Sequence, residues 1–164
     1  ERFGMDVQQL TTLYLINLIL NIGLAPLLGR AVARYGERNA LVLEYFGLAL
    51  VFFAYGGIYL FGWGILIAAS LYILDHLFFA LALAIKTYFQ KIADPQDIAA
   101  TAAVAFTINH IAAIFLPVSL GFLWLKSPFL VFCTAGTLAI FSFVLALLIP
   151  REPRIGKETI FCVS

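Results

Sequence analysis

The chain has 164 residues, of which 63% are hydrophobic and 12% charged, and its net charge is +1. Ordinary soluble domains are roughly 45–50% apolar and ~25% charged, so a water-soluble fold of this size has nowhere to place so much apolar surface. The mean hydropathy of +1.03 therefore indicates an integral membrane protein, and the small net charge gives no reason to expect nucleic acid as a partner.

Five apolar segments are each long enough to cross a hydrocarbon core of ~30 Å, which takes ~20 helical residues. They predict an all-α bundle with helices over residues 11–34, 39–57, 61–87, 97–125 and 128–149, followed by a tail over 151–164. The second and third segments come from one apolar run, in which "YGGIYLFGWG" is expected to reverse the chain. The two cysteines, Cys133 and Cys162, are too few for a disulfide framework and lack the spacing of a metal site.

Lysine and arginine fall almost entirely on one side of these predicted crossings. Only Arg2 and Lys126 fall on the other side, whereas the first side carries Arg30, Arg34, Arg38, Lys86, Lys91, Arg151, Arg154 and Lys157. Basic residues concentrate in cytoplasmic loops, so we expect the N-terminus outside and the tail in the cytoplasm. Trp63 and Trp124 then lie at the outer interface, where aromatic belts occur.

The most charged stretch of the first seventy residues is "GRAVARYGERN", residues 29–39, which we predict as a short cytoplasmic loop. Anchoring by the positive-inside rule is sufficient to explain its arginines. The order of its residues also resembles the signature of major facilitator superfamily (MFS) transporters, Gly-x-x-x-Asp-(Arg/Lys)-x-Gly-(Arg/Lys)-(Arg/Lys). Four positions agree and two differ: Gly29, Arg34, Gly36 and Arg38 match, while Ala33 and Glu37 depart.

In that family the motif joins helices two and three, and a degenerate copy joins helices eight and nine. The long inner loop "KTYFQKIADPQD" and the alanine-rich segment after it resemble the approach to helix eleven and that helix itself. The resemblance implies that the five crossings are helices eight to twelve, a partial MFS six-helix bundle. The first residue is Glu1 rather than methionine, so we expect a fragment that lacks helix seven and the N-terminal half.

The implied function is secondary active transport of a small solute by alternating access, with proton coupling left open. No enzymatic activity and no cofactor are expected. The expected partners are the solute, the lipid bilayer and the missing N-terminal half, without which the fragment should not transport. The short tail carries no eukaryotic address, which favours the bacterial inner membrane.

We expect the charged loop to act as a cytoplasmic gate. Gly29 would allow close helix approach and Gly36 a tight turn. Its arginines, Arg30, Arg34 and Arg38, can bond helix C-terminal carbonyls or reach a carboxylate, for which Glu44 in the next helix is the local candidate.

Ionisable groups inside a spanning helix cost ~2.5–3.5 kcal/mol on insertion scales, so they are functional candidates. The expected substrate or proton pathway consists of Asp75, His76, His110, Asn109, Asn17 and Asn21, with Asp75 the best candidate for coupling. Structural roles remain open: the asparagines can join helices by hydrogen bonds, His110 can be a packed neutral imidazole, and Asp75 can be a structural partner of a histidine.

Two further interpretations belong to other classes of protein. His76 and His110, predicted at similar depth on neighbouring antiparallel helices, are a possible ligand pair for a haem. A five-helix assembly subunit with no transport activity is the other alternative.

Overall fold

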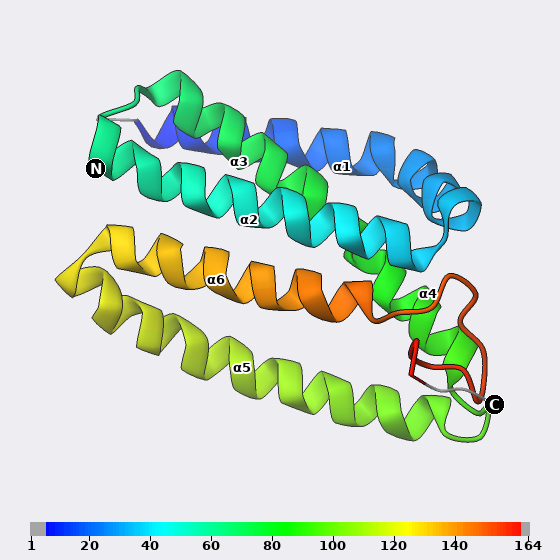
Figure 1. Cartoon of the computed structure of the whole chain (residues 1–164). Coiled ribbons are helices and arrows are strands. Elements are labelled where there is room, and N and C mark those ends of the chain that lie inside the picture. Colours follow the sequence, from blue (N-terminus) through cyan, green and yellow to red (C-terminus); the bar gives the residue numbers. More distant parts are fainter. Residues whose placement is uncertain (1–5, 162–164) are drawn as a thin grey trace.

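The computed structural model describes residues 6–161, which fold as a bundle of helices that run alternately up and down (Figure 1). The helices are α1 (Val7–Tyr35), α2 (Glu37–Phe61), α3 (Ile65–Phe79), α4 (Leu83–Ile92), α5 (Ile98–Lys126) and α6 (Pro128–Leu147). A 3₁₀ turn, η1 (Ala80–Ala82), joins α3 to α4, so that these three elements form one long span, Ile65–Ile92.

Residues 6–161 form five helical spans long and apolar enough to cross a membrane, α3 to α4 counting as one, which confirms that part of the predicted fold and marks the chain as an integral membrane protein. α6 begins at Pro128 as predicted and α5 agrees with its predicted bounds to one residue, whereas the other helices differ more. α1 starts four residues earlier, because Asp6 caps it: the Asp6 carboxylate accepts from the backbone N–H of Val7 at 2.7 Å, and Gln9 closes a capping box.

The two connections beside α2 differ from the predicted ones. The connection after α2 is displaced and not shortened: the predicted helices leave residues 58–60 between them, whereas α2 is capped by Gly62 in a left-handed conformation (φ 67°, ψ 30°) and residues 62–64 lead to α3. The connection before α2 is shorter than the predicted residues 35–38: α1 continues to Tyr35, α2 begins at Glu37, and Gly36 alone connects them, so the charged stretch 29–39 is helical except at Gly36. Its φ of 84° and ψ of 157° are accessible essentially only to glycine, which explains how one residue reverses the chain.

The predicted connection between the third and fourth helices, residues 88–96, is also wrong in its first half. Lys91 belongs to α4, which continues to Ile92, and only residues 93–97 connect it to α5. Lysine is a good helix former, so a charged turn at a membrane surface can extend a spanning helix as easily as end it.

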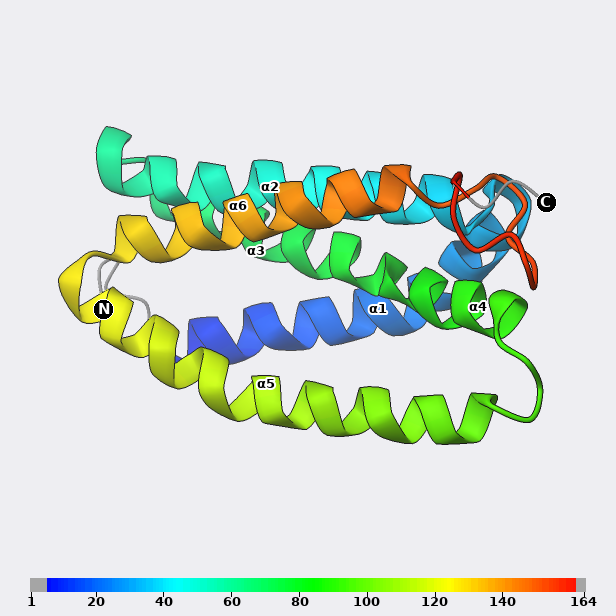
Figure 2. The same ribbon diagram turned by 60° about the horizontal axis from the view of Figure 1, so that its bottom comes forward.

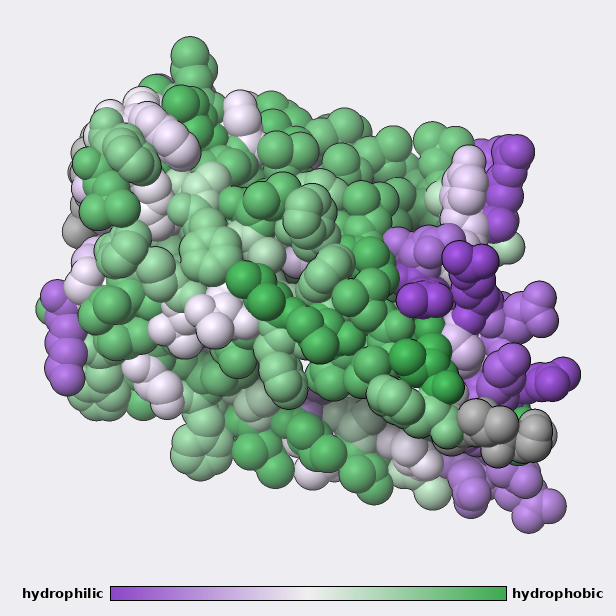
Figure 3. Space-filling model, viewed as in Figure 1, coloured by the Kyte–Doolittle hydropathy of each residue, from purple (hydrophilic) through white to green (hydrophobic). Residues whose placement is uncertain are grey.

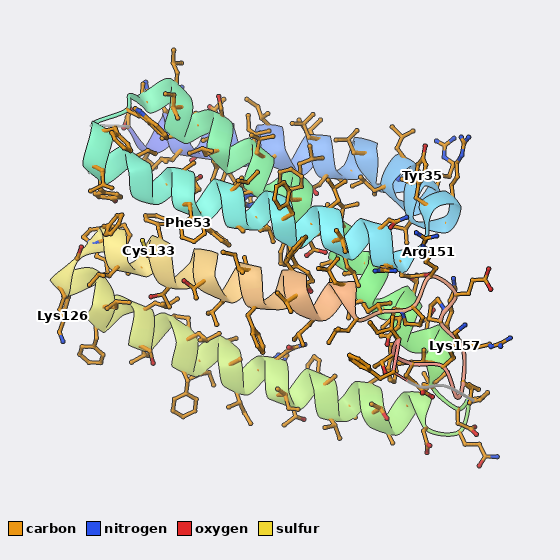
Figure 4. The ribbon with its side chains drawn as sticks, viewed as in Figure 1. Tyr35, Phe53, Lys126, Cys133, Arg151 and Lys157 are labelled. Atoms are coloured by element: carbon orange, nitrogen blue, oxygen red, sulfur yellow. The ribbon has the colours of Figure 1, made fainter. Side chains whose placement is uncertain are left out.

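α2 is the centre of the bundle, and its broadest contact is with α6. Small residues make the contact close: a Cβ added to Gly136 of α6 would lie 2.9 Å from the ring of Phe53, which Figure 4 shows between the two helices. On another face of α2, a Cβ on Gly47 would lie 2.5 Å from the ring of Phe78 in α3. Phe78 packs against all three clusters of buried residues and therefore ties them together.

α5 is the least covered helix. In Figure 1 α6 lies between α5 and α2, and α5 packs chiefly against α6. None of its residues is buried. Figure 2 gives a second view, in which α5 again occupies the outside of the bundle.

The polar surface is concentrated at one end of the bundle, as the hydropathy colours in Figure 3 show. We call this the charged end; Arg151 and Lys157 lie there, while Lys126 lies at the opposite end (Figure 4). The segment after α6 folds back over the charged end. Ile160 donates its backbone N–H to Leu148 at 2.9 Å, and the Tyr88 hydroxyl of α4 donates to the carbonyl of Glu158.

Candidate functional site

The polar pair of α3 lies in the middle of its span. Asp75 is ten residues from the start of the span, which places it about 15 Å along a helix that rises ~1.5 Å per residue. Asp75 Oδ2 lies 3.5 Å from Nδ1 of His76, and both side chains are about one-third exposed or less, at 27% and 34%. Successive side chains diverge by ~100° around a helix, but this does not prevent the contact.

His76 makes a second contact through the same ring nitrogen. Its Nδ1 lies 3.1 Å from the carbonyl oxygen of Tyr72, one turn earlier, and the two rings are 4.5 Å apart. A proton on Nδ1 can be shared between the Tyr72 carbonyl and the Asp75 carboxylate, so one ring nitrogen serves both contacts.

Asn17 joins α1 to this part of α3. Its side chain is 2% exposed, and its Nδ2 donates to the same Tyr72 carbonyl at 3.4 Å. Asn21, one turn later, donates to the carbonyl of Asn17 at 3.0 Å and stays within its own helix. Asn17 therefore joins two helices by a hydrogen bond, which is one of the structural roles that the sequence left open. The Asn21 bond stays within α1 and joins no second helix.

Two cavities lie between α1 and α3, one on each side of the Asn17–Tyr72 hydrogen bond along the helices. The larger, about 460 Å³, is lined by Tyr14 of α1, Tyr55 of α2 and Tyr72 of α3, together with apolar residues. The smaller, about 160 Å³, is lined by Asn17 and Asn21 together with Leu20, Leu24, Ile73 and Leu77. Asp75 interacts electrostatically with the phenol of Tyr55, which connects the carboxylate to the larger cavity.

The structure does not bring Asn109 and His110 into this site. Both are exposed on α5, which packs chiefly against α6, whereas α3 packs chiefly against α2 and α1. Nδ1 of His110 contacts the carbonyl of Phe106 in the preceding turn at 2.9 Å, and their rings are 3.9 Å apart. The pairing of His76 with His110 required by the haem interpretation is therefore absent from the described residues.

The predicted gate residues gather at the charged end, but not with the predicted partners. Arg30 bonds the carbonyl of Pro26 through Nε at 3.2 Å, and the Arg34 guanidinium lies 5.7 Å from the centre of the Tyr35 ring. Arg38 forms no ion pair with Glu44. The expected close approach at Gly29 is also missing, since an added Cβ there would meet no atom within 4 Å.

The ion pair at the charged end is one that the sequence did not indicate. Glu37, 3% exposed at the start of α2, accepts from Lys91 Nζ of α4 at 2.7 Å. The predicted helix bounds place Lys91 in a loop. Lys91 lies instead in α4, and this helical extension brings its ammonium group to Glu37 at the start of α2. Gly36, beside this pair, lies under the segment after α6, with the carbonyl of Arg151 3.9 Å from where its Cβ would be.

Glu44 is buried within α2 instead of reaching the arginines. It is 2% exposed, and its Oε2 has no hydrogen-bond partner among the described residues. It lies one turn after Leu41 and one turn before Gly47, on the face of α2 that packs against η1 and Phe78. A second acid thus lies inside the bundle, about 10 Å along the helix from Glu37.

Comparison with protein-family models, with curated proteins and with solved structures finds no match to this chain. The assignment of function therefore depends on the chemistry of these residues.

Proposed function

We propose that this chain is the part of a secondary carrier that contains helices eight to twelve of an MFS-like fold, and that the carrier moves a small solute by alternating access. The observation that carries the proposal is Asp75, a carboxylate deep within a spanning helix, between α3 residues that line two cavities: Tyr72 lines the larger, and Ile73 and Leu77 line the smaller. A charged group at this depth is expensive, and in membrane proteins such groups mark the paths of substrates and protons.

No lysine or arginine among residues 6–161 forms an ion pair with Asp75, whose side-chain contact is with His76. A structural carboxylate would be expected to have such a partner, since an unpaired buried charge destabilises the fold. Asp75 is instead suited to take up a cation, either a proton or a charged solute, and to release it when the cavity opens to the other side.

The uncovered faces of α1 and α5 support a second bundle as the partner. α5 places Thr107, Asn109 and His110 near the middle of its span with no helix over them. Polar side chains at such depth normally face a bundle interior or a water-filled cavity and not lipid. The second bundle is, in this proposal, the N-terminal half, and Asn109 and His110 contribute to the pathway from across the central cavity.

The charged end is the cytoplasmic side in this proposal, in accordance with the positive-inside rule, and the membrane is the bacterial inner membrane. The gate at this end consists of Gly36 and the Glu37–Lys91 pair, with Glu44 behind them. The pair joins α4 to α2, and η1 separates α4 from α3, so α4 can tilt at this break when the pair opens.

The test is uptake by cells whose natural gene is edited at single codons, so that whatever completes the bundle is present. A panel of labelled amines, sugars and amino acids is measured in the Asp75→Asn variant and in Asp97→Asn, which makes the same change at an exposed position of the charged end. We expect uptake of at least one solute to fall at least tenfold with Asp75→Asn and to be unchanged with Asp97→Asn. Equal uptake of every solute by both variants and the unedited cells would refute the proposal.

A further inference from the structure

The larger cavity has three tyrosines from three different helices. Tyr14 comes from α1, Tyr55 from α2 and Tyr72 from α3, and the remaining lining is almost entirely apolar, with Thr11 the other polar side chain. Its volume of about 460 Å³ lies within the ~300–1,000 Å³ typical of small-molecule sites. The Thr11 hydroxyl is already bonded to the carbonyl of Val7 at 2.8 Å, so the phenol hydroxyls are the side-chain hydrogen-bonding groups of the lining that remain for a ligand.

Asp75 supplies the charge for this cavity. Residues 68, 72 and 75 lie on one face of α3, since positions four and seven residues apart align on a helix; Ala68 and Tyr72 line the cavity, and Asp75 follows them one turn deeper. Its carboxylate interacts electrostatically with Tyr55 on the facing helix.

We propose that this cavity binds an organic monocation, a protonated or quaternary amine, with its cationic centre between the tyrosine rings and Asp75. The inference rests on the proposed function in taking the cavity as the solute site, but binding can be measured without transport. It names the class of solute that the carrier moves.

Other classes of ligand suit the cavity less well. An anion would be repelled by Asp75, and a sugar needs many donors and acceptors, whereas the mostly apolar lining offers it little beyond three phenol hydroxyls. A metal ion needs several ligands, and residues 6–161 contain no group of three or more His, Cys, Asp and Glu side chains close enough to hold one. Aromatic faces attract cations through the ring quadrupole, and this attraction strengthens where water is excluded.

The experiment uses benzyltrimethylammonium as the probe and neopentylbenzene, in which carbon replaces the charged nitrogen, as its uncharged isostere. Binding is measured by isothermal titration calorimetry on the protein purified from cells that carry its natural gene. We expect the amine to bind and the isostere not to bind, because the two differ only in the charge that Asp75 recognises.

Two pairs of variants test the residues. Asp75→Asn should weaken amine binding on the order of 30-fold by removing the partly buried partner charge, whereas Asp97→Asn should leave it unchanged. Tyr14 is 59% exposed, so its replacement does not endanger the fold. Tyr14→Leu should weaken binding about two- to fivefold, while Tyr14→Phe, which keeps the ring, should not.

The outcomes separate this inference from the proposed function. Equal binding of probe and isostere, no binding of the probe, or unchanged binding in Asp75→Asn would each overturn the inference; absence of probe binding is also the result expected if Asp75 takes up only a proton. In that case the uptake experiment can still show a carrier that depends on Asp75. Conversely, amine binding with no Asp75-dependent uptake would support the site and refute the transport role.

Discussion

The contact between Gly47 and Phe78 allows a quantitative prediction about what holds the bundle together. Gly47→Ala would place a methyl carbon 2.5 Å from Cε1 and Cζ of the Phe78 ring and 2.6 Å from Cδ1. Ordinary carbon contacts begin near ~3.5 Å, so the ring must move by about 1 Å. Phe78 cannot move freely, because it packs against all three core clusters.

Two opposing terms set the size of the effect. Overpacking a core costs ~1–3 kcal/mol, whereas replacing glycine by alanine inside a helix gains ~1 kcal/mol. The expected net destabilisation of Gly47→Ala is therefore about 1 kcal/mol, within a range of roughly 0–2. Gly121→Ala in α5 is the matched control: an added Cβ there meets nothing within 4 Å, so only the gain applies.

The assay is reversible unfolding in mixed micelles with increasing dodecyl sulfate, followed by far-ultraviolet circular dichroism. Gly47→Ala should unfold at lower dodecyl sulfate than Gly121→Ala, with a difference in unfolding free energy of about 2 kcal/mol. Adding Phe78→Leu to Gly47→Ala should cost less than Phe78→Leu alone, because the smaller side chain relieves the overlap. Equal stability of Gly47→Ala and Gly121→Ala, or additive effects in the double variant, would refute the reasoning.

Three other predictions use the same unfolding assay. Lys91→Met should cost about 2 kcal/mol because it leaves the buried Glu37 carboxylate unpaired, and adding Glu37→Gln should recover most of the loss; no recovery would contradict the pairing. Asn17→Ala should cost ~0.6 kcal/mol by removing the bond from α1 to α3, and Asn21→Ala less; the reverse order would argue against that bond. Gly36→Ala should cost ~1–3 kcal/mol because its backbone conformation excludes a Cβ, and an unchanged stability would contradict the single-residue turn.

The sequence was sufficient to predict the five crossings, because hydropathy and length depend on composition alone. The sequence pattern predicted several helix ends wrongly, because charged residues occur both in loops and in the last turn of a helix. Lys91 illustrates this: the predicted bounds place it in a loop, and it lies within α4. The Gly36 turn was expected, but nothing in the local pattern indicated that one residue would be enough.

The candidate site could be predicted only in part. Asp75 and His76 are conspicuous as ionisable neighbours in an apolar run, and Asn17 as a polar residue in another, but their contact through the Tyr72 carbonyl depends on the packing of α1 on α3. His110 appeared equivalent to His76 by depth, yet depth does not show which helices are adjacent. Tyr14 and Tyr55 are not among the predicted site residues, because tyrosine is common in membrane helices and only the packing of the helices shows that three tyrosines line one cavity.

Water access to the cavity beside Asp75 tests the central claim most directly. The first variant is Leu77→Cys, since Leu77 lines the smaller cavity together with Asn17 and Asn21. The control is Phe79→Cys, because Phe79 is two residues further along α3, on the opposite side of the helix, and 66% exposed. With Cys133 and Cys162 replaced by serine, a membrane-impermeant maleimide is applied from each side of the membrane in turn. An alternating-access carrier predicts that Leu77→Cys reacts from both sides and Phe79→Cys from neither. Failure of Leu77→Cys to react, or equal reaction at the two positions, would contradict the account.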